Sequence, residues 1–199
     1  MASGRSSWAC RPTSRRARLT LLDRLVAASG GRPVEADIPF WFGQVKAGKK
    51  STLDTETMGR VWAVTIMAYR NTAAGPDGTL AIAAAELRTA AALGRPVRIG
   101  QETNDLGTDP TEVKQTFYGQ TQTRMNDQLA QVDSGAAAYA TYAGVRSTTR
   151  RGMPRWRRDG GLRCEGAVTR DRTRRHTRAV HVVVPVTSPV GRPGQQEAP

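Results

Sequence analysis

Apolar residues recur at helical spacing in four stretches of the chain, which predicts four helices. The stretches are 18–28, 53–60, 79–93 and a long one that opens at Asp109 and Pro110 and runs past Val132. The third is alanine-rich and is followed by Gly94, a residue typical of the position just after a helix ends. In the fourth, Pro110 stands in the first turn, where no helical hydrogen bond needs its missing N–H.

Four further runs of apolar residues predict strands. They cover residues 34–40, 61–70, 96–102 and 138–145. Pro39 should stand at the end of the first strand, because proline lacks the N–H that a central strand needs. Helices and strands that alternate along a chain indicate a parallel sheet, since parallel neighbours require crossover connections. We therefore expect an α/β fold.

Polar or aromatic residues gather at the C-terminal ends of three of these strands, which favours a barrel over a doubly wound sheet. In (β/α)8 barrels the site is built from several strand ends. No G-x-G-x-x-G opens a helix, and Gly48-Lys49 is not part of a Walker loop, so no cofactor is expected. A whole barrel takes roughly 250 residues. We therefore predict a partial (β/α)8 TIM-type barrel, about the last four β/α units, over residues 18–145.

The net charge of +13 belongs to the two ends of the chain. Residues 1–17 are rich in Ser, Arg and Pro and are predicted to form a disordered basic segment. Residues 146–199 hold thirteen Arg against four acids and are predicted to be an irregular tail, whereas the middle is about neutral. Arg-rich ends suggest non-specific binding to nucleic acid, because Lys and Arg displace the counterions of phosphate backbones.

The composition changes abruptly at about residue 146, where the apolar period is lost. We interpret residues 146–199 as a frameshifted translation of a GC-rich bacterial gene. Read two bases later, the first codons of this region can spell Val-His-Asp, which would be a plausible barrel strand end. A natural Arg-rich tail is the alternative, and the nucleotide sequence read in all frames would decide between them.

Several classes of site are not indicated. Cys10 and Cys164 are the two cysteines, one in each unusual end, so neither a disulfide framework nor a metal site is expected. No run of about 18 apolar residues predicts a membrane span. The first 30 residues lack a continuous apolar segment, so the chain as written has no signal peptide and is expected in the cytoplasm.

The segments DIPFWF, VTIMAYRNTAAGPDG, RPVRIGQET and YAGV, in this order, resemble the later half of bacterial TIM-barrel proteins of the glycoside-hydrolase-like kind. The segment IMAYR is similar to the M-x-Y-D strand end of family-eighteen chitinases. Met67 and Tyr69 match that motif, whereas Arg70 stands where the family has Asp. The likeness covers about residues 19–145 and implies a parent protein that acts on or binds a carbohydrate, in a family that includes secreted members.

The acid signature D-x-x-D-x-D-x-E of the chitinases is absent from this chain. The resemblance implies that the proton donor would lie on an earlier strand than any present here. We therefore expect a fragment that is inactive as a hydrolase by itself. The alternatives are a nucleic-acid-binding protein that uses its basic ends, and a small α/β domain that binds a metabolite at Glu102 and Tyr69.

The alternation of side chains along the strands selects the candidate site residues, since the outward positions of a barrel should be apolar. Four side chains then point to the barrel mouth: Asp37, Trp41, Tyr69 and Glu102. Two carboxylates with aromatic rings suit glycoside chemistry. Glu102 and Asp37 are the catalytic candidates, and the substrate-binding candidates are Trp41, Tyr69 and Arg70.

Each candidate also has a structural interpretation. Asp37 would be an interior ion-pair partner of Arg98, and Glu102 would cap the loop that follows it. Arg70 would pair with Asp77. The two aromatic candidates would be core residues: Trp41 and Tyr69.

Overall fold

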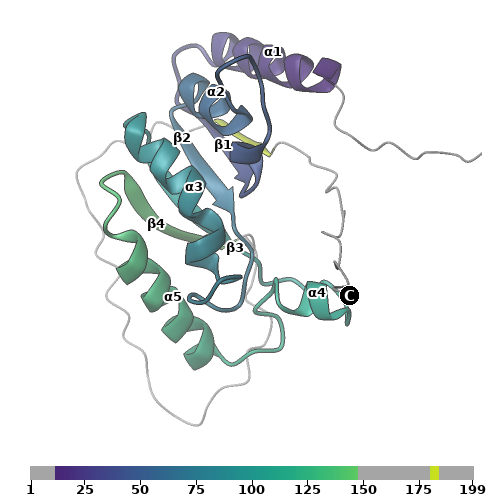
Figure 1. Ribbon diagram of the computed structural model, residues 1–199, viewed down its shortest axis with the longest axis vertical. Coiled ribbons are helices and arrows are strands. Elements are labelled where there is room, and N and C mark those ends of the chain that lie inside the picture. Colours follow the sequence, from purple (N-terminus) through teal and green to yellow (C-terminus); the bar gives the residue numbers. More distant parts are fainter. Residues whose placement is uncertain (1–11, 148–179, 184–199) are drawn as a thin grey trace, which may run out of the picture.

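The computed structural model describes residues 12–147 and 180–183 (Figure 1). Its helices are α1 (Pro12–Ala28), η1 (Phe42–Gln44, a 3₁₀ turn), α2 (Leu53–Arg60), α3 (Thr79–Ala92), α4 (Pro110–Val113) and α5 (Gln122–Ala136). Its strands are β1 (Val34–Pro39), β2 (Ala63–Met67), β3 (Val97–Gln101), β4 (Tyr142–Ser147) and β5 (Val180–Val183). No helix within these ranges is long and apolar enough to cross a membrane.

All strands of the sheet are parallel, in the order β4-β3-β2-β1-β5. The predicted α/β fold is thus confirmed, and β1 to β4 lie side by side in chain order with helices between them. Pro39 is the last residue of β1, as its missing N–H predicted. The carboxyl ends of β1, β2 and β3 meet at one edge of the sheet, which is where parallel strands bring distant residues together.

Four helices, α1, α2, α3 and α5, form one layer over one face of the sheet, and α4 lies apart from it (Figure 1). Neighbouring helices touch in the order α1, α2, α3, α5. Every second residue of the strands packs against them, as expected for the helix-facing side of a parallel sheet. The core joins strand and helix side chains: Val34, Ala36, Ile38, Val64, Ile66, Val97 and Ile99 with Leu22, Met58, Leu87 and Val132.

The alternate residues of the strands make the opposite face polar. There Glu35 of β1 accepts from Arg98 of β3 at 3.2 Å and from Arg146 of β4 at 3.4 Å. Strands β1 and β4 are three strand spacings apart, roughly 14 Å in a flat sheet. Arginine and glutamate side chains are long enough for their charged ends to meet across this separation, so the two side chains join β1 to β4 over the polar face.

Strand β4 contains a bulge that changes which of its side chains face the helices. Its register with β3 shifts between Val97 and Ile99, which pair with Tyr142 and Val145. Gly144, at φ 94°, lies within the bulge and adopts a backbone conformation that favours glycine. The extra residue turns Val145 toward the helices and leaves Arg146 on the polar face.

The long helix predicted from Asp109 onward is wrong, because the chain forms α4 and α5 with a turn between them. Phe117 is buried in this turn and Gly119 has φ 75°, so the helix cannot continue through them. Thr121 then caps α5 by accepting from the N–H of Arg124. A buried side chain between two helices is a tertiary contact that the helical period did not indicate.

The ends of the domain also differ from the predicted boundaries. Helix α1 begins at Pro12, so residues 12–17 are helical and not disordered. Strand β4 continues to Ser147, two residues into the predicted tail, and β5 within that tail pairs with β1, so these parts of the tail are not irregular. Residues 1–11, 148–179 and 184–199 lie outside the described residues, and with them both cysteines and most of the segment interpreted as frameshifted.

Candidate functional site

Three of the predicted site residues come from adjacent strands. Asp37 lies near the end of β1, Tyr69 lies two residues beyond β2, and Glu102 directly follows β3. Asp37 is in register with Thr65 of β2, which is in register with Arg98 of β3. The strand order therefore brings the three candidates to one edge of the sheet.

Tyr69 is the centre of this group. Its ring rests beside Gly100, where an added Cβ would lie 3.5 Å from Tyr69 Cε1 and 3.2 Å from Thr65 Cγ2. Burial, and then the charges of Glu102 and Asp37, raise the pKa of Tyr69 to about 12. The phenol is thus protonated at neutral pH and can both donate and accept a hydrogen bond. We refer to Asp37, Tyr69, Gly100 and Glu102 as the strand-end site.

Glu102 is held by the loop that follows it. Its Oε1 accepts from Thr103 N at 2.7 Å, from Asn104 N at 2.8 Å and from Asn104 Nδ2 at 2.7 Å. Its carbonyl oxygen accepts from Phe117 N at 3.0 Å. The structural interpretation of Glu102 as a loop cap is therefore confirmed. The same bonds fix the carboxylate in one position beside Tyr69.

Arg70 is held by an acid from its own loop. Its Nε and Nη2 donate to Asp77 Oδ1 at 3.0 and 2.8 Å, and Lys114 reaches the other oxygen of Asp77 at 2.7 Å. Its guanidinium also lies over the Phe40 ring, 5.6 Å from the ring centre. The predicted pairing with Asp77 is confirmed, so Arg70 fixes the loop after β2. Its role in binding substrate stays a prediction.

Trp41 does not follow the alternation of β1, because the strand ends two residues earlier. It precedes η1 and packs edge-on against Phe42, with ring centres 5.3 Å apart. It also contacts the hydrophobic core. These contacts agree with the structural interpretation of Trp41 as a core residue.

The polar face holds residues that the sequence analysis passed over. The ion-pair partner recorded for Arg98 is Glu35, whereas the sequence suggested Asp37. Glu35 has the inward alternation of β1, a signal that was present in the sequence. Arg146 was assigned to the tail because the Arg-rich composition begins at this residue.

A second group of acids is buried in the helix layer. Glu86 of α3 is fully buried, and its Oε1 accepts from Gly43 N at 3.0 Å. Asp54 of α2 is almost fully buried on the other side of Gly43, where an added Cβ would lie 3.2 Å from Glu86 Oε1 and 3.3 Å from Asp54 Oδ2. Burial, with a smaller contribution from the charge of Asp54, raises the pKa of Glu86 to about 7. Glu86 lies at helical spacing from the buried Ala83 and Ala90, a signal in the sequence that the predicted site did not use.

Among the described residues, no three Asp, Glu, His or Cys side chains lie together in a way that could hold a metal ion. The available groups at the strand ends are carboxylates, a neutral phenol and backbone groups. They are suited to hydrogen bonding with hydroxyl groups. No protein-family model, curated protein or solved structure matches this chain.

Proposed function

We propose that the strand-end site binds a carbohydrate and that the sheet is part of a (β/α)8-type barrel. The observation that carries the proposal is the position of Tyr69, a protonated phenol beside Gly100 on which the charges of Glu102 and Asp37 act, at the carboxyl ends of three adjacent parallel strands. Sites of (β/α)8 barrels lie at this end of the strands.

Three features favour a barrel over an open, doubly wound sheet. Strands β1 to β4 are neighbours in chain order, and the helices between them share one face. The face away from the helices is polar, and Arg146 of β4 reaches Glu35 of β1 across it. In a barrel the face away from the helices is the interior, and interior positions alternate with helix-facing ones along each strand.

Carbohydrate fits the chemistry of the site. Sugar hydroxyls both donate and accept hydrogen bonds, and carboxylates accept while a protonated phenol does both. The ring of Tyr69 beside Gly100 adds an apolar surface of the kind on which a sugar ring can pack. The similarity of IMAYR to a chitinase strand end agrees with this class of ligand.

Binding, and not hydrolysis, is the activity that we propose for this chain. Glycoside hydrolysis needs one carboxyl group that gives a proton and a second that serves as base or nucleophile. Glu102 is tied by three donors of its own loop, an arrangement that suits a fixed acceptor. Asp37 is the second carboxylate whose charge acts on Tyr69.

Titration calorimetry of the full chain with chito-oligosaccharides and a panel of other neutral oligosaccharides tests the proposal. We expect binding to at least one of them, weakened about tenfold or more by Asp37→Asn and severalfold by Tyr69→Phe. A hydrogen bond that involves a charged group contributes about 1.5–3 kcal/mol, one between neutral groups about 0.5–1.5 kcal/mol, and 1.4 kcal/mol is a tenfold change.

Tyr139→Phe is the matched control, because Tyr139 lies in the turn before β4, at the other edge of the sheet. This variant should bind as the wild type does. The proposal fails if no oligosaccharide binds, or if Tyr69→Phe and Tyr139→Phe bind equally well. Release of reducing sugar by the wild type would show that the chain is a hydrolase.

A further inference from the structure

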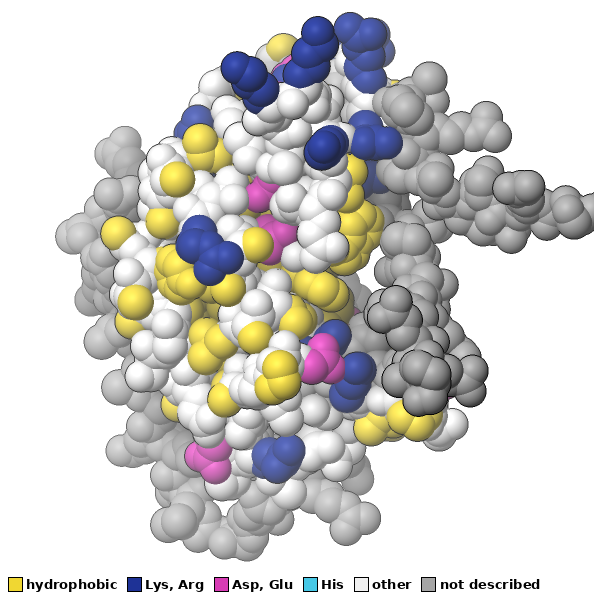
Figure 2. All heavy atoms as spheres, in the orientation of Figure 1, with side chains coloured by type: hydrophobic (Ala, Val, Ile, Leu, Met, Phe, Trp, Pro, Cys, Tyr) yellow, Lys and Arg dark blue, Asp and Glu magenta, His cyan; other side chains and the backbone are white. Residues whose placement is uncertain are grey.

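A group of basic side chains covers one end of the molecule, away from the strand-end site residues. Seven cations on α1 and on the loop after η1 form what we name the basic surface: Arg15, Arg16, Arg18, Arg24, Lys46, Lys49 and Lys50. The two segments are joined, since Arg15 Nη1 donates to the carbonyl oxygen of Lys46. Figure 2 shows Lys and Arg side chains gathered over α1, at the top of the view.

This surface has little compensating negative charge. Asp23 is the one acid in the sequence of the two segments, residues 12–28 and 45–51. Its carboxylate is paired with Arg60 of α2 at 2.9 Å. Five of the seven cations are exposed: Arg16, Arg24, Lys46, Lys49 and Lys50. The folded domain, residues 12–147, has a net charge of only +3 and thus presents a concentrated positive surface.

Helix α1 packs against the core through its apolar side, so its basic side chains extend from a helix with a fixed position. Leu22 is buried, and Leu19 and Val26 pack against the core. The guanidinium of Arg18 lies 5.5 Å from the centre of the Phe42 ring. Because the apolar side of α1 is used in packing, it cannot enter a lipid layer as the apolar face of a membrane-surface helix does.

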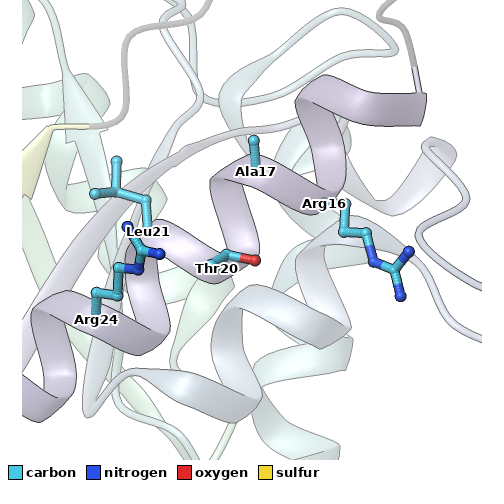
Figure 3. Close-up of a pocket in the computed structure, with 5 residues that line it drawn as sticks. All are labelled: Arg16, Ala17, Thr20, Leu21 and Arg24. Carbon is cyan, nitrogen blue, oxygen red and sulfur yellow. The ribbon is translucent and has the colours of Figure 1, made fainter.

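The outward side of α1 has a regular arrangement (Figure 3). Five of its residues line a surface hollow: Arg16, Ala17, Thr20, Leu21 and Arg24. Arg16 and Arg24 are eight residues apart, which is about 12 Å along a helix axis. The major groove of B-DNA is also about 12 Å wide, with a row of phosphates on each side.

We propose that the basic surface binds the phosphate backbone of double-stranded nucleic acid. Arg16 and Arg24 contact phosphates on the two sides of a groove, and Lys49 and Lys50 contact the phosphates beyond it. Arginine suits this role because its planar guanidinium can donate two hydrogen bonds to one phosphate. The binding has no base readout and is therefore independent of sequence.

A duplex fits better than a single strand. Single-strand binders stack bases on exposed aromatic rings. Next to the basic surface, Phe42 is fully buried and Trp41 is packed against it. Among the described residues, the large hydrophobic side chain exposed on this surface is Leu21 and not an aromatic one.

The test compares the full-length wild type with Arg16→Gln/Arg24→Gln and with Lys49→Gln/Lys50→Gln. Binding to a duplex of about 20 base pairs is followed by fluorescence anisotropy from about 50 to 300 mM KCl. Each phosphate contact contributes about 0.9 to the slope of log K against log salt. Each double variant should therefore lower the steepness by about 2 and weaken binding about tenfold or more at 100 mM KCl.

The control is Arg88→Gln/Arg124→Gln, which removes the same charge from exposed positions on α3 and α5. It should bind within about twofold of the wild type, and circular dichroism should show that all variants fold alike. If the control and the basic-surface variants bind the duplex equally well, the proposal is overturned, because other basic residues of the chain would then hold the duplex. The basic-surface variants are also compared with the wild type on an acidic polysaccharide and on vesicles containing phosphatidylserine. If these variants lose more affinity for either of those ligands than for the duplex, the choice of partner is overturned.

Discussion

The buried carboxyl group of Glu86 links a single residue to the pH dependence of the whole fold. Its Oε1 accepts from Gly43 N, and its Oε2 has no hydrogen-bond partner among the described residues. Asp54 faces it across Gly43, and Arg88 lies on its own helix and opposes the effect of burial. A protonated carboxyl suits this position, because an ionised one would be desolvated beside a second acid.

The first prediction concerns the pH dependence of stability. The Glu86 carboxyl ordinarily ionises near pH 4.5, whereas in the folded protein its pKa is about 7. The folded state therefore binds more protons between these pH values, and the free energy of unfolding should fall as pH rises through this window. Glu86→Gln removes the titration, so this variant should be more stable than the wild type at pH 8 by about 1–3 kcal/mol.

Urea unfolding of both proteins at pH 5 and pH 8 measures this difference. The free energy of unfolding of Glu86→Gln should exceed that of the wild type only at pH 8. Glu112→Gln, at an exposed position of α4, should show the pH dependence of the wild type. Parallel pH profiles for wild type and Glu86→Gln would contradict the prediction.

At the scale of elements, Glu35 connects three strands across the polar face. Its carboxylate accepts hydrogen bonds from Arg98 of β3 and Arg146 of β4, and its side chain is 11% exposed. Asp77 offers a natural comparison, since it also receives two cations, Arg70 and Lys114, but its side chain is 53% exposed. The two acids thus differ mainly in their access to water.

The second prediction is that Glu35→Gln destabilises the fold much more than Asp77→Asn does. Removal of a buried acid leaves its cations without their partner, which we expect to cost about 1–3 kcal/mol here because the two arginines are partly solvated. Exposed ion pairs contribute about 0–1 kcal/mol, so Asp77→Asn should cost less than 1 kcal/mol. Chemical denaturation measures both values, and equal losses would refute this account of the polar face.

The elements also show which patterns are sufficient to predict local structure. Residues 53–60 and 79–92 form the helices that their period indicated, within one residue at either end. The predicted helix after Asp109 failed because Phe117 turns into the core and interrupts it. Periodicity describes one face of a helix, and it does not detect an apolar side chain that breaks the helix to reach the core.

At the scale of the whole molecule, burial is concentrated in the middle of the sheet. Val64 and Ile66 of β2 and Val97 and Ile99 of β3 are completely buried. Helix α4, in contrast, has no buried residue. Local stability follows burial and backbone hydrogen bonding, so the domain should open from the α4 region and not from the sheet centre.

The third prediction is therefore a pattern of hydrogen exchange. In mass-spectrometric exchange of the full chain, peptides covering 63–67 and 97–101 should exchange slowest among the described residues. Peptides covering 104–115 should exchange orders of magnitude faster, because their amides are near solvent. Similar rates in β2 and α4 would mean that the sheet centre is not the stable part of this fold.

The sequence by itself determined the α/β class, the parallel sheet and the faces of its strands. These features can be predicted from local sequence, because each signal depends only on residues close together in the chain. The signals are the apolar period, Pro39 at the end of a strand and Gly94 after a helix. It also placed Asp37, Tyr69 and Glu102 at strand ends, because alternation along a strand follows directly from residue order.

Only the tertiary structure decided which charged groups meet. Glu35 and Arg146 are 111 positions apart and come into contact because strand order and the bulge at Gly144 place both side chains on the polar face. The basic surface likewise needs α1 to lie beside the loop of Lys46, Lys49 and Lys50. Contacts between distant segments depend on register and packing, which no local pattern contains, and this is why the sequence predicted the strand ends but neither of these charged groups.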